Sequence, residues 1–136
     1  MQAVIDTNII VSGLLNPSNP PGEIIDMLFS GQIVLVYDDR ILNEYSIVLR
    51  RNKFSFPLKD IDVFLETIRS IGERVVPFHL PVSLPDDKDR CFIECALSTR
   101  EKIIITGNKK HFLLSAMKDI TVLSPREFIT AARFQQ

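Results

Sequence analysis

Four segments of the chain carry carboxylate or amide side chains at positions suited to metal binding. Asp6 and Asn108 each follow a short apolar run, whereas Glu44 and Asp89 lie in segments whose apolar residues have helical spacing. Oxygen ligands of this kind suit Mg²⁺ or Mn²⁺. A divalent cation also relieves the repulsion between neighbouring carboxylates. The four segments together therefore predict a divalent-cation site.

Helical geometry predicts where the acids of the two helical segments point. The apolar residues of 41–49 form one stripe, and Glu44 falls on its margin, half-buried. Asp89 falls within the apolar arc of its helix and points toward the core, whereas Glu94 falls on the solvent-facing side. Asp86 lies on the loop that leads into this helix. Each acid alone also fits a helix cap or a solvated position, so the prediction depends on the set.

These acids need a scaffold that brings distant segments together. Short apolar runs alternate with helical patterns, which is typical of an α/β fold with a parallel sheet covered on both faces. Ligands bind such sheets beyond the carboxyl ends of the strands. Strands are predicted at 3–6, 32–37, 102–106 and 120–123, with an extended segment at 74–78. Helices are predicted at about 22–31, 38–51, 57–71, 88–99 and 109–117, and from Pro125 onward.

Length and composition set the remaining bounds. The 136 residues favour a single domain, 1–136, and a net charge of −1 excludes a global basic field, so a polyanion would need a local patch. No signal peptide or membrane span is expected, because Asp6 interrupts the first apolar run and later runs are short. Cys91 and Cys95 lie among apolar residues on one helix, which indicates a structural role and a cytoplasmic location.

Four motifs resemble those of PIN-domain ribonucleases in order and spacing, over essentially the whole chain. They are VIDTNIIVSGLL, the Glu of LNEYSIVLRR, LPDDKDRCFIECAL and IIITGNKKHF. The likeness is to a branch of toxin components of toxin–antitoxin pairs, related to VapC. It implies a PIN-like three-layer α/β/α sandwich with a central, mainly parallel sheet of four to five strands. It also implies Mg²⁺- or Mn²⁺-dependent endoribonuclease activity, and a toxin role in a type II pair.

The resemblance also implies roles for individual residues. Asp6, Glu44 and Asp89 match the catalytic metal-binding acids, and Asp86 and Asn108 complete the expected metal ligands. Supporting roles fall to Thr7 and Asn8, which match residues that hydrogen-bond the first acid, and to Thr106. Asn108 and Lys88 stand where many relatives carry acids, which makes the site less negative and leaves open whether it holds one metal or two.

Partners follow from the same likeness and from local charge. Basic residues that could attract RNA lie in two runs: Arg50, Arg51 and Lys53, and Lys109 and Lys110. A cognate antitoxin protein and a homodimer are expected, with Ile24, Ile25 and Leu28 as candidate dimer contacts. The two histidines, His79 and His111, show no spacing typical of a catalytic site.

Two alternatives remain open. A PIN-like module could hold RNA or a protein partner without cleaving, which the departures at Asn108 and Lys88 favour. A haloacid-dehalogenase-type phosphatase also begins with a strand that ends in Asp. That family requires a second Asp at the position of Asn8, and it places its Thr-bearing strand before the later acids, the reverse of the order found here.

Overall fold

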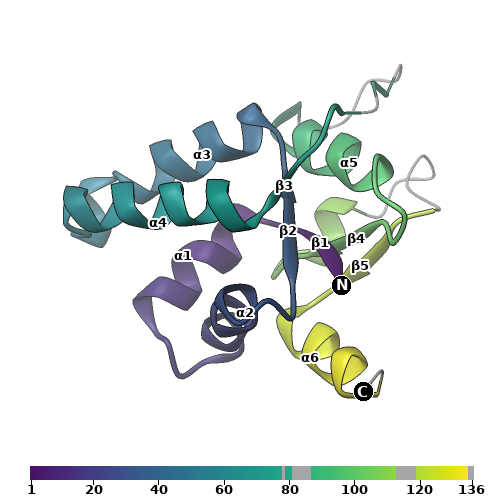
Figure 1. Ribbon diagram of the computed structural model, residues 1–136, viewed down its shortest axis with the longest axis horizontal. Helices are drawn as coiled ribbons and strands as arrows, with labels where there is room; N and C mark the ends of the chain where they lie inside the picture. The colour runs from purple at the N-terminus through teal and green to yellow at the C-terminus, as the bar shows by residue number, and fades with distance from the viewer. Residues whose placement is uncertain (78, 81–86, 113–118, 135–136) are drawn as a thin grey trace.

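The computed structural model describes residues 1–77, 79–80, 87–112 and 119–134 (Figure 1). Its centre is a five-stranded parallel sheet with the strand order β3-β2-β1-β4-β5. The strands are β1 (Gln2–Ile5), β2 (Val34–Tyr37), β3 (Glu73–Arg74), β4 (Ile103–Ile105) and β5 (Thr121–Leu123). The chain moves outward from β1 to β3, then crosses back to place β4 on the other side of β1.

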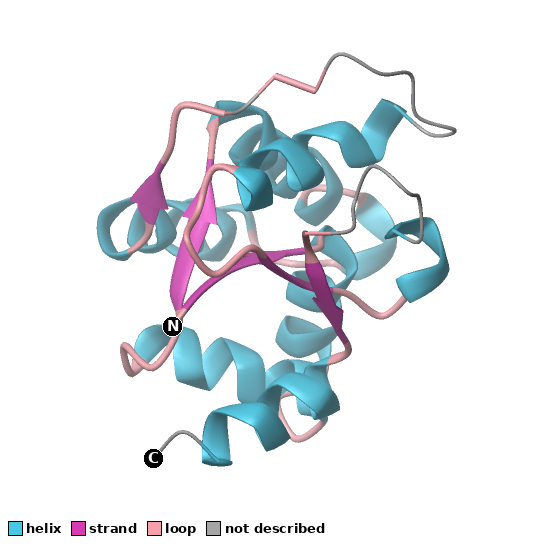
Figure 2. Cartoon of the chain, turned by 90° about the vertical axis from the view of Figure 1, so that its right-hand side faces the viewer, coloured by secondary structure: helices cyan, strands magenta, loops and turns pink. Residues whose placement is uncertain are grey.

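Helices cover both faces of this sheet. They are α1 (Thr7–Leu15), α2 (Pro20–Phe29), α3 (Asp39–Leu49), α4 (Leu58–Ile71), α5 (Arg90–Leu97) and α6 (Pro125–Phe134). Short 3₁₀ helices are η1 (Asn52–Phe54), η2 (Asp87–Asp89) and η3 (Lys109–Phe112). Figure 1 shows α1 to α4 on one side of β2 and α5 on the other, and Figure 2 shows the same strands enclosed by helices.

The central strands form where apolar residues are continuous. Val4 and Ile5 of β1 pair with Ile104 and Ile105 of β4, and all four side chains are fully buried. A strand buried on both faces needs apolar residues at every position, which is why these runs do not alternate with polar residues. The same register places the residues that follow the two strands side by side.

Local capping fixes where α2 and α3 begin. The Asn19 side chain accepts a hydrogen bond from the backbone N–H of Gly22 at 2.9 Å and caps α2. The Asp38 side chain accepts one from the backbone N–H of Ile41 at 3.0 Å and caps α3. Gly31, with φ of +86°, ends the α2 turn in a backbone conformation that glycine adopts without strain. The cap at Asp38 therefore sets where α3 begins, and so where Glu44 lies along the sheet edge.

The predicted three-layer α/β/α fold is confirmed, and the sheet is entirely parallel. Helix α1 was not predicted, because residues 7–15 are almost continuously apolar and show no clear helical stripe. The extended segment predicted at 74–78 is shorter, since β3 covers only Glu73–Arg74. The helix predicted at 109–117 is the 3₁₀ helix η3 as far as Phe112, and the rest lies outside the described residues.

Among the described residues, no helix combines the length and the apolar character needed to cross a membrane.

Candidate functional site

The candidate site begins where β1 and β4 end side by side. The backbone N–H of Asp6 donates to the carbonyl of Ile105 at 2.9 Å, which extends the β1–β4 pairing by one residue. The Thr106 hydroxyl donates to Asp6 Oδ2 at 2.7 Å and accepts the backbone N–H of Asn108 at 3.1 Å. Thr106 is fully buried, so its hydroxyl fixes both the Asp6 carboxylate and the turn that carries Asn108.

The Asp6 side chain is half-buried where β1 ends. Burial raises its pKa above the ordinary value, although the hydrogen bond from Thr106 and the backbone N–H groups of Thr7 and Asn8 act in the opposite direction. A carboxylate in this state gains stability from a nearby cation, since positive charge favours the ionised form that burial disfavours.

Glu44 reaches the same edge of the sheet from α3. Its carboxylate is half-buried, as predicted, and Oε2 accepts a hydrogen bond from the Thr7 hydroxyl at 2.8 Å. Thr7 therefore acts on two of the predicted ligands: its side chain supports Glu44, and its backbone N–H faces Asp6. Asn8 is exposed, and its contribution is likewise through the backbone.

Tyr45 fixes α3 against the end of β1. It is fully buried, and its hydroxyl donates to the carbonyl of Ile5 at 2.5 Å. Burial raises the Tyr45 pKa well above its ordinary value, and the negative charges of Asp6 and Glu44 add to this effect. The charges of Asp6 and Glu44 therefore both affect the Tyr45 hydroxyl. Sequence patterns indicated Tyr45 only as a core residue of the α3 stripe.

Asp89 arrives from the opposite layer, at the start of α5. It is mostly buried, with 17% of its side chain exposed, and Oδ2 lies 3.8 Å from Nδ1 of His111. The other ring nitrogen of His111 lies 3.0 Å from the Asn108 side-chain amide. His111, which lacked any typical spacing in the sequence, thus connects two of the predicted ligand positions. The positive charge of His111, when protonated, also lowers the Asp6 pKa, but by less than burial raises it.

The predicted metal ligands do not form a closed cluster among the described residues. Within the described residues, no three His, Cys, Asp or Glu side chains are close enough to enclose an ion by themselves. Asp86 lies outside the described residues, and its predicted role stays a prediction. The predicted ligands among the described residues all offer oxygen atoms, from carboxylates and one amide, a set that fits a hard divalent cation whose remaining ligands are waters.

The two basic runs differ in their distance from this edge. Arg50 hydrogen-bonds Asp62 at 2.6 Å near the far end of α3, about 9 Å along the helix from Glu44. Lys109 pairs with Glu127 at 3.0 Å, and exposed Lys110 follows it directly. The run at Lys109 and Lys110 adjoins Asn108, so it is better placed than the other to meet a polyanion at the site.

The remaining residues of the first run are also near the far end of α3. Arg51 is exposed, and Lys53 lies over the Phe54 ring at 5.1 Å.

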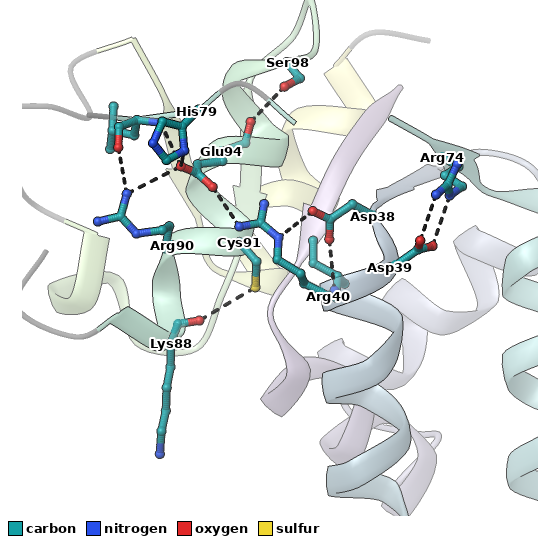
Figure 3. A network of polar contacts seen from close by, with 12 residues as sticks. Asp38, Asp39, Arg40, Arg74, His79, Lys88, Arg90, Cys91, Glu94 and Ser98 are labelled. Carbon is teal, nitrogen blue, oxygen red and sulfur yellow. Dashed lines mark hydrogen bonds and ion pairs between the residues drawn. The ribbon is translucent and has the colours of Figure 1, made fainter. Parts of the chain in front are cut away.

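The prediction that Glu94 faces solvent was wrong. Only 2% of its side chain is exposed, and it accepts hydrogen bonds from Arg40 Nη1 at 2.8 Å and from the backbone N–H of Leu80 at 2.7 Å (Figure 3). Burial raises the Glu94 pKa, but these hydrogen bonds outweigh it and leave the pKa below its ordinary value. A carboxylate can be buried at this position because hydrogen-bonding partners arrive from other segments.

The cysteines have the structural role that the sequence indicated. Both thiols are free and buried on α5. Burial raises the pKa of Cys91 to about 12, with the charge of Glu44 as the next cause. Neither thiol is therefore ionised near neutral pH.

Comparisons with known proteins agree with this architecture. A family model described as PIN domain matches residues 2–110. An uncharacterized protein from Methanocaldococcus jannaschii is 29% identical over 143 residues, an alignment that covers 95% of this chain and 90% of the relative. No solved structure matches. The family match spans both strand ends that carry Asp6 and Thr106, and the helices that carry Glu44 and Asp89. This chain therefore belongs to the PIN-domain family.

Proposed function

We propose that this protein is a metal-dependent endoribonuclease that hydrolyses RNA phosphodiester bonds. Membership of the PIN-domain family indicates a nuclease-type function. The observation that carries the finer proposal is the half-buried carboxylate of Asp6, fixed by Thr106 at the carboxyl edge of the sheet. Glu44 and Asp89 extend toward this edge from the helical layers on the two sides of the sheet.

Two of the proposed ligands are each held by a threonine before any metal binds. Thr106 holds Asp6, and Thr7 holds Glu44, through hydroxyl groups that leave other carboxylate lone pairs available. We assign Asp6, Glu44 and Asp89 as ligands of Mg²⁺ or Mn²⁺. When bound, such an ion lowers the pKa of a coordinated water and polarises the phosphate.

The neighbouring side chains supply orientation and attraction. Asn108 offers a neutral oxygen, and its amide nitrogen faces His111, which keeps the amide in one orientation. Lys110 and Lys109 place positive charge beside Asn108 and attract the RNA backbone to this edge. The carboxylates act first as ligands in this proposal, and none of them is required to serve as a general base.

The toxin role is a further part of the proposal, and it is supported by the sequence motifs. It includes a cognate antitoxin protein and a homodimer. The residues expected to form the dimer contact need revision, because Ile24, Ile25 and Leu28 are buried in the core of one chain. Any dimer must therefore use other side chains of this protein.

A cleavage assay on mixed RNA tests the enzymatic proposal against the binding-module alternative. We expect cleavage with Mg²⁺ or Mn²⁺, loss of cleavage with EDTA, and recovery when metal is restored. RNA binding without cleavage at any metal concentration would instead support a non-catalytic module, which Asn108 and Lys88 favour. Growth arrest on expression of the chain alone, relieved by a small neighbouring open reading frame, tests the toxin role.

A further inference from the structure

A charged network that includes no proposed metal ligand links the two helices that carry Glu44 and Asp89. Its centre is the ion pair between Arg40 of α3 and Glu94 of α5, with Nη1 and Oε1 2.8 Å apart (Figure 3). The Arg40 Nε donates to Asp38 Oδ2 at 2.7 Å, and Asp38 in turn caps α3. One guanidinium therefore ties the start of α3 to the middle of α5.

The α5 side of this network is equally well anchored. Glu94 Oε2 accepts the backbone N–H of Leu80 at 2.7 Å and lies 3.5 Å from Arg90 Nη1. Arg90 also donates to the Leu80 carbonyl at 2.8 Å. Among the described residues, two carboxylates balance two guanidinium groups in this network, and His79 Nδ1 lies 3.6 Å from Glu94 Oε2. The network is therefore poorly suited to attract phosphate, and a positioning role suits it better.

The positions of these residues on their helices connect the network to the site. Arg40 lies four residues before Glu44, one turn away on the same side of α3. Glu94 lies five residues after Asp89 on α5. We infer that the Arg40–Glu94 ion pair sets the separation between Glu44 and Asp89, and thereby the affinity of the site for a divalent cation. Arg40 and Glu94 are positioning residues in this inference, which rests on the proposed function.

A second ion pair at the start of α3 provides a matched control. Arg74 of β3 hydrogen-bonds both carboxylate oxygens of Asp39, at 3.0 and 2.8 Å (Figure 3). This pair is exposed, and it joins α3 to β3, not to α5. Exposed pairs contribute about 0–1 kcal/mol to stability. Arg74→Gln therefore removes the same charge from the same end of α3 without loosening the link to α5.

The direction of the change in cation affinity distinguishes a positioning role of Arg40 from a direct electrostatic one. Loss of a positive charge near a cation site strengthens cation binding through Coulomb interactions alone. If the ion pair positions the ligands, Arg40→Gln has the opposite effect. Loss of a group that orients metal ligands typically weakens metal affinity by about 10- to 100-fold. We expect about a tenfold loss for Arg40→Gln, because Arg40 acts through the helix.

The experiment measures Mn²⁺ binding directly, from the electron paramagnetic resonance signal of free Mn²⁺. The proteins compared are the parent, Arg40→Gln, Glu94→Gln, the double variant of these two residues, and Arg74→Gln. Cleavage is followed alongside. We expect weaker binding in both single variants, no further loss in the double variant, and parental affinity or tighter binding in Arg74→Gln. At saturating Mn²⁺, kcat recovers, and KM for RNA does not change.

Circular dichroism and thermal unfolding confirm that each variant is folded. Should Glu94→Gln fail to fold, Arg40→Gln decides, since the Arg40 side chain is 43% exposed and Glu94 keeps its contacts with Leu80 and Arg90. Folded Arg40→Gln with parental or tighter Mn²⁺ binding overturns the inference and leaves the proposed function intact. An equal loss in Arg74→Gln also overturns it. A parent chain that binds no Mn²⁺ overturns the proposed function, and the inference with it.

Discussion

Replacement of Thr106 by valine tests the hydrogen bond on which the proposed site depends. Valine keeps the shape of threonine but removes the hydroxyl that donates to Asp6 and accepts from the Asn108 backbone. A hydrogen bond to a charged group contributes about 1.5–3 kcal/mol, and the stranded backbone N–H adds about 1 kcal/mol. We therefore expect Thr106→Val to lower the free energy of unfolding by about 3 kcal/mol in the metal-free protein.

Thr106→Ser is the matched control. It keeps the hydroxyl and loses one buried methyl group, which costs about 1 kcal/mol. Urea unfolding at neutral pH, without metal, measures both variants against the parent. A Thr106→Val variant no less stable than Thr106→Ser would show that the hydroxyl contributes nothing, and the account of Thr106 would be wrong.

The same pair of variants predicts a shift in the pH dependence of cleavage. The Thr106 hydroxyl stabilises ionised Asp6 and so lowers its pKa, against the larger effect of burial. Without the hydroxyl, that pKa rises further, and a proton competes with the metal up to a higher pH. The acidic limb of the cleavage profile should therefore move to higher pH in Thr106→Val and stay near the parental position in Thr106→Ser. An unmoved limb in both variants would separate Asp6 ionisation from catalysis.

Variants at three residues test other parts of the site. Asp6→Asn should abolish metal-dependent cleavage. At pH 7 this variant should unfold in urea no more easily than the metal-free parent, because burial raises the Asp6 pKa and the ionised side chain opposes folding above that pKa. Clear destabilisation of the variant would contradict this. Tyr45→Phe should cost about 1–3 kcal/mol of unfolding free energy, since it strands the buried carbonyl of Ile5; an unchanged urea midpoint would count against it. Asn108→Ala should reduce cleavage modestly, and Asn108→Asp should tighten Mn²⁺ binding in a metal titration; Asn108→Ala as inactive as Asp6→Asn would refute this ranking.

The sequence predicted those parts of the site that depend on neighbouring strands. Asp6 and Thr106 follow two apolar runs, and parallel pairing of those runs necessarily places both at one edge of the sheet. Glu44 was likewise predictable, because its half-burial follows from the position of one residue on a helical stripe. In each case a periodicity within a single segment, or one rule of sheet topology, was sufficient.

Residues whose role depends on a distant partner were not predictable in this way. Glu94 falls outside the apolar arc of its helix, yet it is buried because partners from other segments reach it, among them Arg40, 54 positions away. His111 acquires contacts with Asp89 and Asn108 through the path of the chain around η3. Thr7 was expected to bond its sequence neighbour, and its hydroxyl also bonds Glu44, 37 positions away.

The arrangement separates the orientation of each ligand from the spacing between ligands. Asp6 and Glu44 are each oriented by one buried threonine, a short local contact that needs no metal. Their positions relative to Asp89 depend instead on how the layers on the two sides of the sheet are joined. Arg40 and Glu94 join those layers close to the site, while Tyr45 joins α3 to the end of β1. Variants of the threonines should therefore change the ionisation and stability of single carboxylates, whereas variants of the ion pair should change metal affinity.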